Sequence, residues 1–240
     1  MKTIIKNNIE TQEFQPKLLV ILTNPFYFAR KGLYQNIKAL SYHISGKILD
    51  VGCGTKPYQD MFKIDEYIGL EYDSAANRIS KKADFFYEGD KFPFKENEFD
   101  SIICNEVLEH VFNPEDFLSE IYRVLRPGGN MLITVPFLWD EHEQPYDYAR
   151  YSSFGLKHLL IETGFEIIES RKSVDDITVI FQMINTYIYK KVAGNKPIKR
   201  VKMRFIRLFC SVFNILGLLF NAILPRNSDL YLDNVVIARK

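Results

Sequence analysis

A hydrophobic run that ends in two closely spaced glycines, Ile48-Leu49-Asp50-Val51-Gly52-Cys53-Gly54, constrains the fold of this chain more than any other feature. Gly-x-Gly after an apolar strand lets the backbone turn sharply and lets a ligand approach where a Cβ would clash. A dinucleotide fingerprint needs a third glycine three positions after Gly54, where this chain has Pro57. The Asp50 carboxylate would also repel a pyrophosphate. It suits a ligand that carries an ammonium group.

Signals for strands and helices alternate along the rest of the chain. Short apolar runs predict strands at 47–51, 67–70, 84–87, 101–104, 131–135, 165–170 and 234–238, with a turn at 126–129. Helices are predicted at 57–62, at 114–125 with Asn113 as N-cap, and from 153 to 163 with Gly164 after the end. This alternation favours a parallel sheet covered on both faces. The predicted fold is α/β, a Rossmann-like, doubly wound sheet of seven strands.

The same pass predicts one core with two additions. Residues 1–46 read as an N-terminal helical extension, and residues 47–175 as the cofactor-binding core. Residues 176–228 form a basic, hydrophobic helical insertion, and residues 229–240 supply the final strand of the core.

Composition excludes several classes of protein. A content of 47% hydrophobic and 25% charged residues is that of a folded globular chain. Three scattered cysteines, Cys53, Cys104 and Cys210, are too few for a disulfide scaffold or a cysteine-rich zinc site, which favours a reducing, cytoplasmic location. We expect Cys53 and Cys104 to be small buried hydrophobic residues. The apolar run 18–22 is too short for a secretory signal, so export is not expected.

Five motifs in order, over about residues 46–170, make the chain resemble the class I S-adenosylmethionine-dependent methyltransferases, of the methyltransferase type 11 kind. They are the glycine motif 50–54, Glu71 after the second strand, Asp90, the segment from 92 to 110, and the turn 123–129. The resemblance implies S-adenosylmethionine as cofactor, with Glu71 accepting both ribose hydroxyls and Asp90 contacting the adenine amino group. The cofactor-binding residues that it implies are Asp50, Gly52, Cys53, Gly54, Glu71, Asp90, Lys91, Asn105 and Glu106.

The chain departs from the family at Lys56, where a third glycine is common. Plainer structural roles also stay open for these residues. They are an ordinary strand-to-helix turn at the two glycines, a helix cap at Asp50, an exposed strand-end charge at Glu71, a turn residue at Asp90, and the start of a helix at Asn105 and Glu106.

A polar, aromatic segment at 139–151 follows the fifth strand, at the edge of the sheet where ligands bind in open α/β folds. Similar segments occur in methyltransferases associated with cell-surface glycan assembly, which the chain resembles here. The segment predicts an acceptor pocket, or alternatively a lid over the cofactor. The predicted acceptor-binding residues are Trp139, Asp140, Tyr146, Asp147 and Arg150.

An alcohol acceptor would need a base to remove its proton, and an imidazole titrates near neutral pH. His142 and His110 are the candidate catalytic residues, although a structural role for His110 at a helix end stays open. His142-Glu143 begins like a zinc-protease signature, but that signature needs a second histidine at position 146, where the chain has Tyr146. No metal site is predicted.

The insertion carries a strong charge asymmetry that the net charge of +1 hides. Between Ile177 and Ser228 there is no acidic residue, and the remaining 22 basic and 30 acidic residues leave −8 for the rest of the chain. The nine basic residues of the insertion are Lys190, Lys191, Lys196, Lys199, Arg200, Lys202, Arg204, Arg207 and Arg226.

Residues 208–224 within the insertion carry no charge. As a helix this segment would be about 25 Å long, short of a bilayer core of roughly 30 Å. If the last strand returns to the sheet, both ends of the segment must lie on one side of a membrane. An interfacial or re-entrant helical hairpin against an anionic membrane is therefore predicted, with a dimer interface or a cover over the domain as the alternative.

The expected function is transfer of a methyl group from S-adenosylmethionine to a small-molecule or lipid-linked acceptor at the inner face of the membrane. A glycan is one such acceptor. An isoprenoid quinone precursor is the alternative acceptor, and a non-catalytic cofactor-binding protein that recruits partners to the membrane is the alternative class. No nucleic-acid partner is expected, because the basic residues flank an apolar segment and do not line the active edge. The sequence does not predict an oligomeric state.

Overall fold

The computed structural model describes residues 14–193 and 200–240, which form two compact units. Residues 36–171 and 233–240 make the first, which we call the sheet unit. Residues 14–35 and 172–232 make the second, the helical unit. The segment boundaries predicted at 46, 175 and 228 stay predictions.

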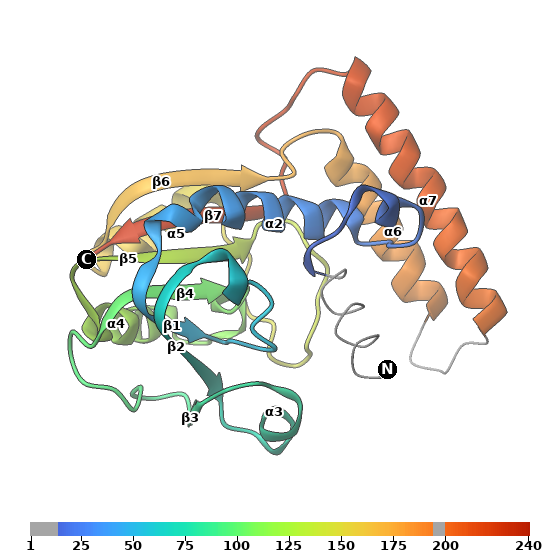
Figure 1. Cartoon of the computed structure of the whole chain (residues 1–240). Coiled ribbons are helices and arrows are strands. Elements are labelled where there is room, and N and C mark those ends of the chain that lie inside the picture. Colours follow the sequence, from blue (N-terminus) through green and yellow to red (C-terminus); the bar gives the residue numbers. More distant parts are fainter. Residues whose placement is uncertain (1–13, 194–199) are drawn as a thin grey trace. The chain divides into compact units, whose positions relative to one another are not determined.

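Seven strands form one sheet in the order β3-β2-β1-β4-β5-β7-β6 (Figure 1). The pairs β1–β2, β2–β3, β1–β4 and β4–β5 are parallel, and β7 runs antiparallel to β5. The α/β, doubly wound, seven-stranded fold is confirmed, as is an apolar helix before the last strand. The strands are β1 (Ser45–Val51), β2 (Lys63–Tyr72), β3 (Phe85–Tyr87), β4 (Phe99–Asn105), β5 (Leu125–Pro136), β6 (Glu166–Ser173) and β7 (Asp233–Arg239).

The central strands are buried on both faces, which is why they are apolar nearly throughout. In β1, Leu49 and Val51 point to one face and pack in a cluster with α4 (Pro114–Val124) and α5 (Ser153–Glu162). Ile48 points to the other face and is equally buried. Both of those helices begin at the predicted place: Pro114 opens α4, although the Asn113 side chain makes no capping hydrogen bond, and the hydroxyl of Ser152 accepts a hydrogen bond from the Gly155 amide at the start of α5 (3.1 Å).

Three local predictions differ from the structure. The helix predicted at 57–62 is wrong, because only a 3-10 turn forms there, η3 (Gln59–Met61), and β2 begins directly after it at Lys63. The first residues of β2 are mostly exposed and polar, which hid them from an apolar pattern. The residues predicted as a turn, 126–129, lie inside β5. The pairing of β5 with β4 is irregular at this place. The short helix α3 (Ala75–Ser80), which buries no residue, was missed because it has no apolar face.

The helical unit contains α6 (Thr178–Ala193) and α7 (Arg200–Ile223), which pack against each other, and the 3-10 helix η1 (Leu18–Leu22), which contacts α7 (Figure 1). Helix α2 (Tyr27–Leu40) starts in this unit, and the 3-10 helix η2 (Ser41–His43) follows it in the sheet unit. The uncharged segment 208–224 thus lies almost wholly in one continuous helix. Of the predicted basic residues, Lys196 and Lys199 lie outside the described residues.

Buried amide side chains join the helices of this unit. The Asn214 amide donates to the backbone carbonyls of Ile21 (2.8 Å) and Asn24 (3.1 Å), and its oxygen accepts from the Asn185 amide (2.9 Å). These bonds satisfy carbonyls at the turn before α2 that would otherwise be buried without a donor.

Candidate functional site

Two glycines in left-handed backbone conformations form the turn after β1. Gly52 has φ +68° and Gly54 has φ +52°. A Cβ on Gly52 would lie 2.3 Å from Cγ2 of Val107, whereas a Cβ on Gly54 would meet nothing within 4 Å. Gly52 therefore permits close packing of the chain, and Gly54 leaves open space beside the backbone, as a ligand-binding turn requires.

Asp50 and Glu71 lie at the carboxyl ends of β1 and β2 and are both buried. The Tyr67 hydroxyl donates to Oδ2 of Asp50 (2.7 Å), and the Gly54 amide donates to Oε2 of Glu71 (3.1 Å). Burial raises the pKa of Asp50 to about 7, against the lowering effect of the Tyr67 hydrogen bond. Glu71 thus holds the glycine turn in place, and Asp50 is a carboxyl group poised near neutrality.

The other predicted cofactor-binding residues lie in different surroundings. Asp90 and Lys91 are exposed. Asn105 ends β4 and Glu106 follows it, and their side-chain oxygens lie 2.7 and 2.8 Å from the Thr134 hydroxyl. The Cys53 thiol is buried, and burial raises its pKa to about 12, so it is a small hydrophobic residue, as predicted. The assignment of these residues to the cofactor stays a prediction.

Lys56, the departure from the family pattern, has φ +58° and directs its ammonium group to Asp84 (2.5 Å). The stem of this side chain lies against Gly69, where a Cβ would come within 2.6 Å of its Cε. Lysine at this position therefore fastens the turn to β2 and to the start of β3.

The predicted acceptor segment is a loop between β5 and α5 that is held by its own ion pair. Both Nη atoms of Arg150 donate to the Asp147 carboxylate (2.6 and 2.7 Å), which holds the pKa of Asp147 down at about 2. Arg150 also donates to the backbone carbonyls of Trp139 (3.4 Å) and Asp140 (3.1 Å). Tyr146 is exposed, whereas the charges of Asp147 and Arg150 are engaged with each other.

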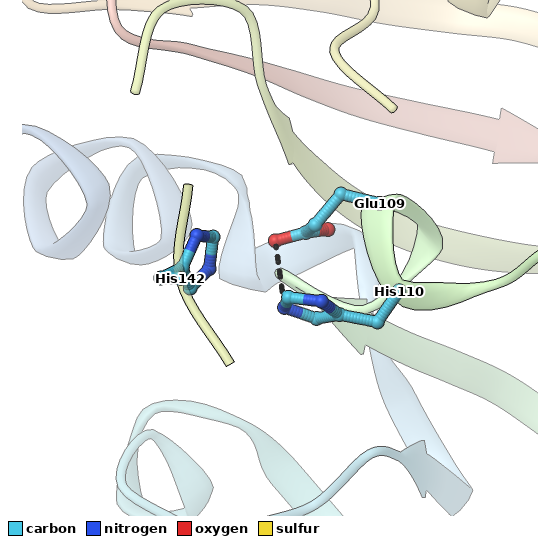
Figure 2. Close-up of side chains that lie close together, drawn as sticks. All are labelled: Glu109, His110 and His142. Carbon is cyan, nitrogen blue, oxygen red and sulfur yellow. Dashed lines mark ion pairs between the residues drawn. The ribbon is translucent and has the colours of Figure 1, made fainter. Parts of the chain in front are cut away.

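The structure brings the two candidate histidines together. The rings of His110 and His142 lie edge to face with centroids 4.8 Å apart. Burial, and then the neighbouring His110, lower the pKa of His142, so its imidazole is neutral at neutral pH. Figure 2 shows that a third side chain, Glu109, points toward them. Sequence reasoning missed Glu109, and also Tyr67, since nothing in the order of residues shows which polar side chains the fold buries.

Comparison with known proteins gives the family. Residues 49–133 match the family described as "Methyltransferase domain". The chain is 30% identical to an uncharacterized protein of Methanocaldococcus jannaschii over 153 residues, 58% of this chain and 74% of the relative. It is 28% identical to a probable S-adenosylmethionine-dependent methyltransferase of Mycolicibacterium smegmatis over 145 residues, 53% of this chain and 55% of that protein. The chain therefore spans only about half the length of the second relative.

Among solved structures, the fold is similar to that of the [4+2]-cyclase SpnF, with a TM-score of 0.56, 18% identity, and coverage of 87% of this chain and 81% of that one. At this identity the similarity concerns the fold alone. Together with the matched domain, the relatives and the glycine turn after β1, it leads to one assignment. The chain belongs to the class I S-adenosylmethionine-dependent methyltransferases, and S-adenosylmethionine is its cofactor.

Proposed function

We propose that this methyltransferase acts on a hydroxyl group of a small-molecule acceptor linked to a lipid, at the surface of an anionic membrane facing the cytoplasm. The observation that carries the proposal is an exposed apolar stripe on α7, described below. A glycan carried on a lipid would combine the polar group that is methylated with the apolar anchor.

In the proposed reaction the acceptor oxygen attacks the methyl carbon of the sulfonium in line with the C–S bond. The O–C bond forms, the C–S electrons stay on sulfur, and S-adenosylhomocysteine leaves. Asp50 and Glu71 are proposed to hold the ammonium and ribose ends of the cofactor, so that positioning supplies much of the rate. The neutral His142 imidazole is proposed to accept the hydroxyl proton, a role that contributes typically 10²–10⁴-fold.

The stripe on α7 runs at helical spacing along one side of the helix. Its members are exposed apolar residues, whereas Asn214 on the opposite side is buried. Arg204 and Arg207 are exposed at the same end as Phe205. The stripe consists of Phe205, Leu208, Val212, Ile215, Leu219 and Ile223, with exposed fractions from 43% to 80%.

An apolar face that points to solvent beside arginines is typical of a helix that lies in the membrane interface. Each basic residue near an anionic surface contributes about 1 kcal/mol, and apolar burial adds about 25 cal/mol per Å². In the described part of the chain, residues 203–223 are also the one helical stretch long and apolar enough to cross a membrane, which by itself is weak evidence. Since β7 returns to the sheet after α7, we favour a helix that lies in the interface.

Flotation with vesicles tests the membrane step. The full chain should float with anionic vesicles, less with neutral ones, and high salt should weaken binding without abolishing it. Replacing Phe205, Leu208 and Leu219 by serine should release the protein. Ile79→Ser with Phe154→Ser is the matched control, because those side chains are exposed on the sheet unit. A dimer interface instead predicts no flotation and a shift from dimer to monomer in sedimentation.

Turnover of S-adenosylmethionine with a membrane extract separates an enzyme from a non-catalytic binder. His142→Ala should lower turnover at least about 100-fold and leave cofactor affinity within about twofold. Equal losses of binding and turnover would make the 139–151 loop a cofactor lid. Mass spectrometry of the methylated product then distinguishes a lipid-linked acceptor from an isoprenoid quinone precursor.

A further inference from the structure

We propose that Glu109, His110 and His142 form a binding site for a divalent transition-metal ion of the zinc class. Figure 2 shows the three side chains directed toward one another, Glu109 and His110 from the 3-10 helix η4 (Leu108–His110) and His142 from the loop after β5. One ligand atom from each residue lies within 4.8 Å of the other two. Metal binding does not require methyl transfer, but the ion would occupy the ring nitrogen of His142 that is proposed above to accept the hydroxyl proton, so the two uses of His142 exclude each other.

Glu109 is the strongest element of the site. Its side chain is fully buried, and within the described residues no other residue donates a hydrogen bond to either carboxylate oxygen. Its Oε1 lies 3.7 Å from Nε2 of His110. A buried carboxyl group without a donor is rare in folded proteins because the charged form loses its hydration. A cation bound between Glu109 and the histidines would compensate the charge of the buried carboxylate.

Both histidines can present a lone pair to the ion. Nδ1 of His110 lies 2.8 Å from the Tyr146 carbonyl oxygen, which only accepts, so Nδ1 is the donor there and Nε2 is the ring nitrogen that faces Glu109. Nδ1 of His142 lies 3.3 Å from the Asp140 carbonyl and 3.3 Å from Oδ2 of Asp147, both acceptors. These two acceptors lie closer to Nδ1 than the competing donor, Nη2 of Arg150 at 3.4 Å, and a proton on Nδ1 leaves Nε2 of His142 as a ligand. Metal-binding histidines are commonly oriented in this way by a carbonyl or carboxylate on the other ring nitrogen.

Asp147 and Arg150 hold the loop that carries His142 in place. The Asp147 carboxylate accepts from the His142 amide (2.9 Å) and from Arg150, so the loop that carries His142 is fastened independently of the ion. Arg150 also lies 3.4 Å from Nδ1 of His142, and its positive charge limits how strongly a cation binds. The carboxylate of Glu109 offsets part of that charge.

The ligand set selects the kind of ion. Two imidazoles and one carboxylate suit Zn²⁺ and its neighbours, whereas Ca²⁺ and Mg²⁺ prefer oxygen ligands alone. Bond lengths of about 2.0–2.2 Å put the ligand atoms roughly 3.3 Å apart, so the cluster would contract by up to about 1.5 Å on binding. Three protein ligands leave a coordination position for water or an acceptor oxygen.

This site differs from the expectation that the chain holds no metal. The signature considered there requires a second histidine four residues after His142. Here the second histidine comes from η4, more than thirty residues earlier in the chain, and the fold alone brings it close.

Calorimetric titration of the chelator-treated full chain with Zn²⁺, without methyl donor, tests the proposal. One ion should bind per chain and raise the thermal unfolding temperature. His142→Ala and Glu109→Gln should each weaken binding at least about 100-fold and remove the thermal shift. His158→Ala, an exposed histidine on α5, is the matched control and should bind as the unaltered chain does.

Absence of stoichiometric binding to the unaltered chain would overturn the proposal, as would equal binding by the His142→Ala and His158→Ala variants. If Glu109→Gln fails to fold, His142→Ala still decides, because His142 lies half-buried in a loop. Since no methyl donor is present, a failed titration leaves the proposed methyl transfer untouched.

Discussion

Asp50 is a carboxyl group that the fold buries with a pKa of about 7, far above that of the same group in an unfolded chain. Between these two pKa values the folded state holds a proton that the unfolded state has lost, so stability falls as the pH rises from about 4 to about 7. Above that range the ionised Asp50 lowers the free energy of unfolding by about 4 kcal/mol. The carboxylate thus lowers stability at the pH at which it would bind a positively charged ligand.

Asp50→Asn should therefore raise the unfolding temperature of the cofactor-free protein at pH 8 and change it little at pH 5, because asparagine keeps an acceptor for Tyr67 and cannot ionise. The same change should weaken binding of S-adenosylmethionine. Thermal unfolding at the two pH values measures the first effect. Asp65→Asn, at an exposed position of β2, is the control. A gain of equal size at both pH values would contradict the assignment.

Glu71 is expected to have two roles. Its carboxylate would bind the ribose, and it accepts a hydrogen bond from the Gly54 amide. Glu71→Ala should weaken S-adenosylmethionine binding by about 1.5–3 kcal/mol, tenfold or more in Kd, and NAD should not bind either form. Calorimetry measures this effect, with Glu66→Ala on the exposed part of β2 as the control. Unchanged affinity for Glu71→Ala would remove Glu71 from the cofactor site.

The sequence predicts residues whose role follows from their place after a strand and misses those whose role follows from burial. Asp50 and Glu71 end β1 and β2, so parallel strands bring them to one edge of the sheet. Tyr67 is one of several tyrosines, and its hydrogen bond depends on the register between β1 and β2, which places Ile48 opposite it. The position of the Glu109 side chain depends on how η4 packs against the 139–151 loop.

Among the elements, α7 buries the Asn214 amide together with Ile206 and Cys210, while most of its large apolar side chains are exposed. Asn214→Leu should destabilise the helical unit by about 2–4 kcal/mol, because the carbonyls of Ile21 and Asn24 lose their donor. Asn221→Leu, on the same helix, should have a smaller effect. Hydrogen exchange across residues 200–223 measures the difference. Similar protection in both variants would show that these bonds contribute little.

Strands and helices were predictable where their apolar residues form a clear pattern in the sequence. The five central strands and α4 meet that condition, and the structure contains them, although β2 and β5 begin well before their predicted starts. β2 begins four residues earlier than predicted because Lys63 and Glu66 keep their side chains in water while their backbone pairs with β1. A pattern of apolar residues does not reveal a strand whose first half is exposed.

In the whole molecule, β7 occupies the position between β5 and β6, although it follows the helical unit in the chain. A variant lacking residues 233–240 should fail to give a soluble, cooperatively folded protein, since β5 loses an antiparallel partner along its length. A variant in which a short linker replaces residues 196–226 keeps β7 and should still bind S-adenosylmethionine. Circular dichroism and calorimetry measure the two outcomes. Cofactor binding by the chain without β7 would show that the sheet is complete without it.

The place of β7 also sets an order of events during synthesis. When β6 leaves the ribosome, about 60 residues remain to be made before β7 follows, which takes several seconds at ordinary rates of translation. During that interval β5 presents an unpaired edge next to an apolar surface, the state in which nascent chains aggregate. Chaperones that shield strand edges are therefore expected to engage this protein late in its translation, while α6 and α7 are emerging.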